Sequence, residues 1–167
     1  MRISVLSNNY TNNDLPAESG LSLFIEYNGR RILIDGGLDK IFMENAKSMS
    51  IDLSTIDYAI LTHGHYDHAG GIVNLGKPTL YTHKNSFKER YRLLPDGHDF
   101  NGVKWDKQIA NCILNDGFTE IEKGVYLSGE IQRPHGTPRN NFFEGDKTTP
   151  DKVEDEQLVI FEHQDGL

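Results

Sequence analysis

The sequence contains only one cysteine, Cys112, among its 167 residues, so it cannot form an intrachain disulfide. No apolar run approaches the length of a membrane-spanning helix, and the first residues, MRISVLSNNY, lack the apolar core of a signal peptide. Basic residues are also scarce, because 17 Lys and Arg stand against 25 Asp and Glu and leave a formal net charge of −8. A nucleic-acid-binding face would need to be basic. We therefore expect a cytoplasmic protein that binds neither nucleic acid nor a membrane.

The chain length predicts a single domain spanning residues 1–167. An Asn28-Gly29 pair between two apolar runs indicates a tight β-hairpin, since both residues tolerate positive φ. Asp39 could cap the first helix. Strands that alternate with helices favour an α/β fold, and the hairpin excludes a purely parallel sheet. The expected strands are 2–6, 21–27, 31–35, 56–62, 79–83, 124–131 and 157–163, and the expected helices are 39–49 and 84–94.

The most informative stretch is LTHGHYDHAGG, residues 61–71, which places three histidines and an aspartate within six positions. Side chains two apart in an extended segment point the same way, so His63 and His65 can bind one ion, with Gly64 letting the backbone pass close. The chain then turns, and Asp67 and His68 can serve a second ion. Imidazole and carboxylate ligands suit zinc, and also iron or manganese.

Two such ions, about 3.5–4 Å apart, would bridge a water molecule, lower its pKa and polarise a carbonyl or phosphoryl oxygen. Asp67 is the expected catalytic residue, because it could position the resulting hydroxide and accept its proton. Asp35 ends the strand ILIDGG and could orient a ligand histidine through a hydrogen bond. The alternative is a turn with surface histidines, but four ligand-type residues flanked by glycines at the end of an apolar strand argue against it.

These residues carry a family resemblance. THGHYDHAGG resembles the H-x-H-x-D-H signature of the metallo-β-lactamase fold superfamily, and ILIDGG is similar to its L-x-D-x-G strand end. AESGLSLFIEYNGRRILIDGG, LTHGHYDHAGGI and YLSGEIQR together resemble the branch that includes the dihydropterin–ribofuranosylaminobenzene phosphate synthase-like proteins. The resemblance implies an αβ/βα sandwich with His63 and His65 at a first metal and Asp67 and His68 at a second. It breaks at Ser19, where the branch usually has the histidine of A-E-H-G.

The implied function is a metal-dependent hydrolase that acts through a metal-bound hydroxide on a small molecule, phosphorylated substrates included. A transferase in pterin chemistry stays open, and β-lactamase activity does not follow from the fold, which hosts many reactions. The hypothesis from another class is a non-catalytic family member that binds metal poorly. An RNA-processing nuclease of the same fold is disfavoured by the acidic balance of the chain.

Several further residues have two open interpretations. Glu130 and Arg133 follow a strand and could position a substrate phosphate or carboxylate, or form a surface ion pair. His83 could approach the metal or be structural. The polar stretch 132–156 is expected to form a mobile flap near the metal edge. Its aromatic residues, Phe142 and Phe143, could cover a ligand or pin the loop. Its acidic residues are interpreted as a solvated run, although Asp155 or Glu156 could bend inward as a hydrogen-bond acceptor: Asp151, Glu154, Asp155 and Glu156.

The superfamily generally draws one further histidine ligand from well downstream and another from near the C-terminus. In the resembling branch the first lies in a G-C-S-H-like stretch, which follows a strand similar to EDEQLVIFEHQDGL, and this sequence stops at Leu167. We therefore expect a C-terminally incomplete sandwich with an exposed strand edge and partial metal occupancy. Such an edge predicts a homodimer or a complementing polypeptide. The alternative is that His83 or His135 substitutes as a ligand.

Overall fold

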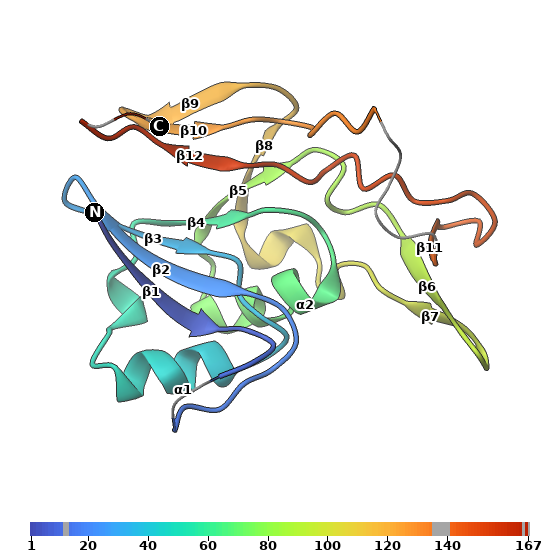
Figure 1. Ribbon diagram of the computed structural model, residues 1–167, viewed down its shortest axis with the longest axis horizontal. Coiled ribbons are helices and arrows are strands. Elements are labelled where there is room, and N and C mark those ends of the chain that lie inside the picture. Colours follow the sequence, from blue (N-terminus) through green and yellow to red (C-terminus); the bar gives the residue numbers. More distant parts are fainter. Residues whose placement is uncertain (12–13, 135–140, 165, 167) are drawn as a thin grey trace. The chain divides into compact units, whose positions relative to one another are not determined.

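The computed structural model describes residues 1–11, 14–134, 141–164 and 166 (Figure 1). The chain divides into two compact units, each assembled from separate stretches of sequence. The first unit consists of Met1–Leu61, Tyr66–Thr82 and Lys104–Ile113, and the second of Thr62–His65, His83–Val103 and Leu114–Leu167. Within the described residues, no helix has the length and apolar character needed to cross a membrane.

A six-stranded sheet in the order β1-β2-β3-β4-β5-β8 dominates the first unit (Figure 1). The pairings β1–β2 and β2–β3 are antiparallel, whereas β3–β4 and β4–β5 are parallel. The sheet is therefore mixed, which confirms the α/β expectation. Its strands are β1 (Arg2–Ser7), β2 (Ser22–Tyr27), β3 (Arg30–Ile34), β4 (Tyr58–Leu61), β5 (Thr79–His83) and β8 (Asn111–Asn115).

The β2–β3 hairpin closes as the sequence predicts. Tyr27 pairs with Arg30, so the loop is the two residues Asn28 and Gly29, with φ values of +48° and +80°. Positive φ at both positions gives a turn whose twist matches that of the paired strands.

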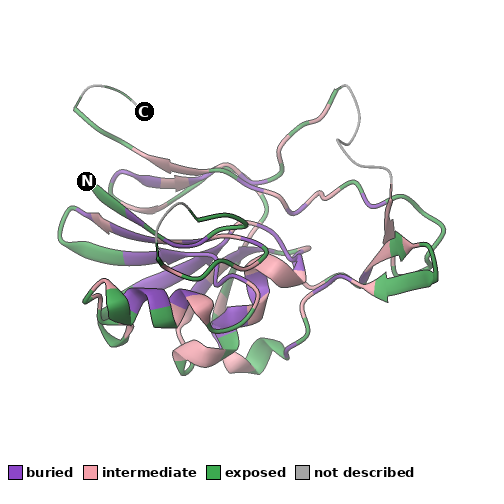
Figure 2. Cartoon of the chain, turned by 60° about the horizontal axis from the view of Figure 1, so that its bottom comes forward, coloured by how far each residue is buried: buried purple, intermediate pink, exposed green. Residues whose placement is uncertain are grey.

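The core of the first unit lies around β4, whose four residues are all buried (Figure 2). Helix α1 (Ile41–Ser48) packs against β1 and buries Phe42, Asn45 and Ala46. Complete burial of Phe42 alone contributes about 1.5–3 kcal/mol. The prediction that Asp39 caps this helix is wrong, because the N-cap is Lys40 and no side chain caps it. Short helical segments complete the unit: η1 (Leu53–Thr55), α2 (Tyr66–Ala69), η2 (Gly70–Leu75) and η3 (Lys107–Ile109).

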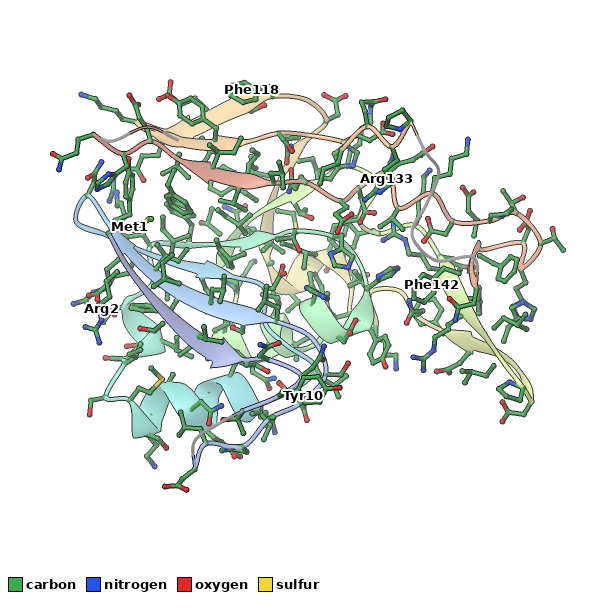
Figure 3. All side chains as sticks on the ribbon, in the orientation of Figure 1. Met1, Arg2, Tyr10, Phe118, Arg133 and Phe142 are labelled. Carbon is green, nitrogen blue, oxygen red and sulfur yellow. The ribbon has the colours of Figure 1, made fainter. Side chains whose placement is uncertain are left out.

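The second unit contains two three-stranded antiparallel sheets, in the orders β12-β10-β9 and β11-β6-β7. Figure 3 labels two residues of this unit, Arg133 and Phe142. Phe142 is the first residue of β11, and Arg133 lies shortly before the undescribed residues 135–140. The strands are β6 (Arg90–Leu94), β7 (Gly97–Phe100), β9 (Thr119–Glu122), β10 (Val125–Leu127), β11 (Phe142–Glu144) and β12 (Val159–Phe161).

The predicted helix 84–94 is wrong. Residues 90–94 form β6, which pairs with β7 across a turn at Pro95-Asp96 and with β11 on its other side. Because β11 comes from about fifty residues further along the chain, its contribution to this strand is invisible in the local pattern. Tertiary pairing of this kind overrides local helix propensity.

Candidate metal centre

The parallel pairing of β3 and β4 explains where the metal-type residues lie. Parallel neighbours end at the same edge of a sheet, so Asp35, after β3, and the histidine cluster, after β4, leave the sheet together. The N–H of Asp35 donates to the carbonyl of Ile60 at 2.9 Å, which holds Asp35 beside the end of β4. Asp35 is fully buried and has a φ of +56°, a sparsely populated conformation outside glycine.

Asp35 fixes the ring of His68. Its Oδ2 lies 2.7 Å from Nδ1 of His68. Because Nδ1 is committed to this carboxylate, any metal bond of His68 must use Nε2. Burial alone lowers the pKa of His68, but the hydrogen bond and charge of Asp35, together with the charge of Asp67, outweigh it and raise the pKa above 6.5. Asp35 therefore contacts a histidine of the cluster, and its orienting role toward a metal ligand stays a prediction.

The raised pKa of His68 gives a testable pH dependence in metal-free protein. A raised folded-state pKa means that the His68–Asp35 pair stabilises the fold fully below pH 6.5 and loses this contribution as the pH rises through the folded pKa. In Asp35→Asn, the hydrogen bond to a carboxylate and the charge of Asp35 are lost, and only the charge of Asp67 still opposes the effect of burial on the pKa of His68. We expect the wild type to be more stable than the variant chiefly at pH 5–6, with a smaller difference at pH 8. Urea unfolding of both proteins measures this, and a difference that grows with pH would contradict it.

Asp67 is held by the segment where the sequence departs from the resembling branch. The hydroxyl of Ser19 donates to Oδ2 of Asp67 at 3.0 Å. At Gly20, φ is +96° and a Cβ atom would lie 1.6 Å from the carbonyl oxygen of Asp67, so only glycine allows this approach. Ser19 therefore contacts a candidate metal ligand, a role that the sequence showed only as a departure from A-E-H-G.

His63 and His65 lie together in the second unit, as their spacing predicts. Their ring centroids are 4.7 Å apart with an interplanar angle of 80°, and each residue is 8% exposed. Nδ1 of His63 is 3.1 Å from Oγ1 of Thr62, and the ring of Phe142 lies 4.9 Å from that of His65. Phe142 thus packs against a metal-type histidine. Phe143 instead contacts His98.

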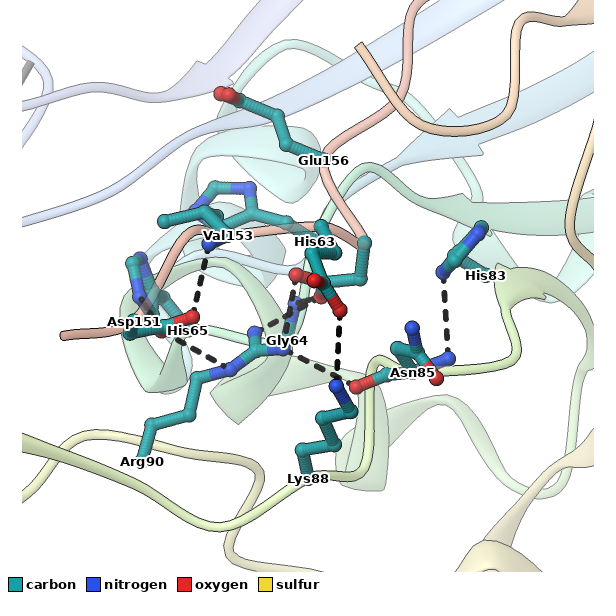
Figure 4. A network of polar contacts seen from close by, with 12 residues as sticks. His63, Gly64, His65, His83, Asn85, Lys88, Arg90, Asp151, Val153 and Glu156 are labelled. Carbon is teal, nitrogen blue, oxygen red and sulfur yellow. Dashed lines mark hydrogen bonds and ion pairs between the residues drawn. The ribbon is translucent and has the colours of Figure 1, made fainter. Parts of the chain in front are cut away.

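The backbone between the two histidines is tightly enclosed. The N–H of Gly64 donates to Oδ2 of Asp155 at 2.6 Å (Figure 4). A Cβ at Gly64 would lie 1.8 Å from the carbonyl oxygen of Ser86, so a side chain here would displace the loop. The N–H of Gln157 also donates to the carbonyl of Thr62 at 3.0 Å. Residues 155–157 therefore run alongside the H-x-H segment.

A buried arginine joins the two carboxylates of this region. Arg90 is 2% exposed, and its Nη1 donates to Oδ2 of Asp155 at 2.9 Å while Nη2 lies 2.8 Å from Oδ1. Its Nε lies 3.4 Å from Oδ2 of Asp151, and that oxygen is 3.8 Å from Nε2 of His65 (Figure 4). Burial alone raises the pKa of Asp151, but the facing imidazole of His65, the guanidinium of Arg90 and the N–H of Val153 lower it below 3.8.

The interpretation of the acidic residues near the end of the chain as a solvated run is wrong for Asp151 and Asp155, and the alternative that Asp155 bends inward as a hydrogen-bond acceptor is confirmed. Asp155 is fully buried and Asp151 is 6% exposed. Only Glu154, paired with Lys88 at 3.0 Å, and Glu156 face solvent in part. Each buried carboxylate is compensated by Arg90, a partner more than sixty positions away that local patterning could not identify.

The remaining candidates have structural contacts. Arg133 is ion-paired with Glu156 and donates to the carbonyls of Lys152 and Val153, so it ties down the 151–157 segment. Glu130 is exposed. The predicted flap contains β11 and ends in this tied segment, while residues 135–140, His135 among them, lie outside the described part of the chain.

His83 is 2% exposed, and its Nδ1 accepts the N–H of Asn85 at 3.3 Å. Burial lowers its pKa below 6.5. These contacts favour the structural interpretation of His83.

The donor set fits a divalent transition metal. Imidazoles and carboxylates are the ligand types such ions take, and Nε2 of His65 is a buried polar atom without a hydrogen-bond partner. Among the described residues, however, no group of three or more His, Cys, Asp or Glu side chains is arranged to hold an ion. The chain therefore shows ligand-type side chains with their orienting contacts rather than a closed coordination shell.

Comparisons with known proteins agree with this chemistry. A family model described as the metallo-beta-lactamase superfamily matches residues 15–142. An uncharacterized protein of Methanocaldococcus jannaschii is 27% identical over 172 residues, covering 95% of this chain and 65% of that protein. A second protein of that organism, named 7,8-dihydropterin-6-methyl-4-(beta-D-ribofuranosyl)-aminobenzene-5'-phosphate synthase, is 32% identical over 150 residues, covering 79% of this chain and 51% of that protein.

A solved structure described as a metal-dependent hydrolase of the beta-lactamase superfamily is similar with a TM-score of 0.83 and 26% identity. The match covers 97% of this chain and 61% of that one. The chain thus spans less than two thirds of the length of each of these relatives.

Proposed function

The chain belongs to the metallo-beta-lactamase superfamily, and we propose that it is a metal-dependent hydrolase acting on a small molecule, phosphorylated substrates included. The observation that carries the proposal is the H-x-H-x-D-H cluster with Asp35 buried against His68 at 2.7 Å. A buried carboxylate that accepts from a histidine ring is the usual outer partner of a metal ligand.

Each residue of the cluster has a proposed role. His63 and His65 would hold one ion, and Asp67 and His68 a second. These ligand types favour zinc and also suit iron or manganese. Such ions supply Lewis acidity and lower the pKa of a water molecule. Asp67, held by the Ser19 hydroxyl, would accept the proton of the attacking water at its carboxylate. Asp35 would keep Nδ1 of His68 occupied, so that its ring stays aligned.

Metal-dependent hydrolysis is directly testable. Protein stripped with a chelator is reloaded with Zn²⁺, Mn²⁺ or Fe²⁺ and assayed on chromogenic phosphomonoesters, phosphodiesters, esters and lactones. For the substrate that is turned over, Asp67→Asn is expected to lose about 10²–10⁴-fold in rate, the size of a general-base contribution. Asp116→Asn is the matched control, because Asp116 is exposed and forms its ion pair with Lys84 at 2.7 Å. Failure of every metal to restore activity on any substrate would favour the non-catalytic hypothesis.

A transferase in pterin chemistry is the second candidate. It is supported by the 32% identity to the protein named as a dihydropterin-linked phosphate synthase, which this chain matches over 51% of that protein's length. Turnover of a pterin substrate in the absence of any hydrolysis would favour it.

We also propose that a second polypeptide, either another copy of this chain or a complementing chain, contributes to the complete site in a cytoplasmic protein. Strand β12 supports the proposal, because it is the first strand in the order β12-β10-β9 and an edge strand can accept a partner. Light scattering of metal-loaded protein tests it, and a monomer that binds metal fully would contradict it.

A further inference from the structure

We propose that Asp151 and Asp155, joined by Arg90, are positioning residues that set the His63–His65 pair for metal binding. Asp155 would fix the backbone between the two histidines, and Asp151 would fix the ring of His65. The inference rests on the proposed metal binding by these histidines and is independent of which reaction the protein catalyses.

Asp155 acts on the backbone at Gly64. Asp155 accepts the Gly64 N–H at 2.6 Å with the same Oδ2 that accepts from Nη1 of Arg90 at 2.9 Å. A hydrogen bond from a backbone N–H to a buried carboxylate is charge-assisted and strong. Because Gly64 lies between the two histidines, fixing its peptide fixes the direction in which both imidazoles leave the chain.

Asp151 acts on the imidazole ring of His65. Its Nε2 is buried and faces Oδ2 of Asp151 across 3.8 Å, and within the described part of the chain neither atom has a hydrogen-bond partner (Figure 4). A carboxylate facing Nε2 favours the tautomer with the proton on that atom, which leaves Nδ1 as the nitrogen that can bind a metal. Asp151 would thus do for His65 what Asp35 does for His68, through the opposite ring nitrogen.

The turn that carries Asp151 is held in a costly conformation. Val153 has a φ of +52°, which is rare for a β-branched residue. Its N–H donates to Oδ1 of Asp151 at 2.8 Å, and its carbonyl accepts from Arg133 at 3.1 Å and from the N–H of Glu156 at 3.1 Å. These bonds direct the other carboxylate oxygen of Asp151 toward Arg90 and His65. A strained residue held from several sides is a feature of functional sites.

The inference is tested with Co²⁺, whose visible absorption reports on its ligands, titrated into metal-free wild type, Asp151→Ala, Asp151→Asn and Glu154→Gln. Glu154 is the matched control, because it lies in the same segment but pairs with Lys88 rather than with the histidines. Asp151→Ala is expected to weaken Co²⁺ binding by about 10–100-fold, the usual cost of removing an outer partner of a ligand. Asp151→Asn keeps a carbonyl oxygen that can face Nε2 of His65 and should bind within about threefold of wild type, with an unchanged spectrum.

A second measurement does not depend on metal. Nitrogen-15 NMR of the metal-free wild type should show His65 with its proton on Nε2, and Asp151→Ala should lose that preference while circular dichroism stays unchanged. If the wild type binds no Co²⁺, the proposal that the protein is a metal-dependent hydrolase is wrong. The tautomer of His65 still decides whether Asp151 positions its ring. Wild-type Co²⁺ affinity and an unchanged tautomer in Asp151→Ala would overturn the inference. Equal losses in Asp151→Ala and Asp151→Asn with a shifted Co²⁺ spectrum would also overturn it, because Asp151 would then be a direct ligand.

Discussion

The double variant His63→Ala/His65→Ala is expected to lose the metal ion of the first site. Four-ligand zinc sites bind with about 10–16 kcal/mol, or about 3 kcal/mol for each ligand, so each lost imidazole should weaken binding by about 100-fold. Metal content after dialysis against a metal buffer measures the loss. Because the two rings lie in a loop after β4 rather than among its buried apolar residues, the far-ultraviolet circular dichroism should change little.

His98→Ala is the matched control for this experiment. His98 is an exposed histidine in β7 whose ring contacts Phe143, and it makes no contact with the H-x-H pair in the described residues. Metal affinity of the wild type should also fall as the pH drops from 8 to 5, since only neutral imidazole binds a metal ion. Equal metal content in the wild type and the double variant, or a flat pH profile, would show that these histidines are not ligands.

Features set by neighbouring residues could be predicted from the sequence. The Asn28-Gly29 turn follows from the tolerance of both residues for positive φ. The buried strand before the cluster follows from its unbroken apolar run, and the pairing of His63 with His65 follows from strand alternation. The contact between Asp35 and His68 could be inferred as well, because two parallel strands deliver both residues to one sheet edge.

Features set by distant partners could not be predicted in this way. The local pattern of residues 84–94 predicts a helix that includes Arg90, yet pairing with β7 and β11 makes residues 90–94 a strand. Asp151 and Asp155 belong to a polar run, and a polar run is normally solvated. Their burial depends on one guanidinium that reaches both carboxylates, and no local window of sequence contains all three residues. Only the folded chain shows that the two buried carboxylates lie beside the H-x-H segment.

Arg90→Met is expected to be the most destabilising single substitution in the second unit. The variant keeps much of the side-chain volume but leaves Asp151 and Asp155 buried without their cation. Breaking a buried ion pair by removing one partner costs about 3–5 kcal/mol, whereas an exposed pair contributes about 0–1 kcal/mol. Lys88→Met is therefore the control, because Lys88 pairs with Glu154 at 3.0 Å near the surface. Urea unfolding with constant m-values would measure both changes.

A rescue experiment separates charge from packing in this result. If uncompensated charge is the cause, adding Asp151→Asn and Asp155→Asn to Arg90→Met should recover part of the lost free energy of unfolding, since the amides carry no charge to bury. If lost packing around the Arg90 stem is the cause, the triple variant should be no more stable than Arg90→Met. Similar losses in Arg90→Met and Lys88→Met would show that the buried cation does not hold the unit together. A large loss with rescue would instead show that the two carboxylates beside the H-x-H segment depend on the charge of Arg90 for their burial.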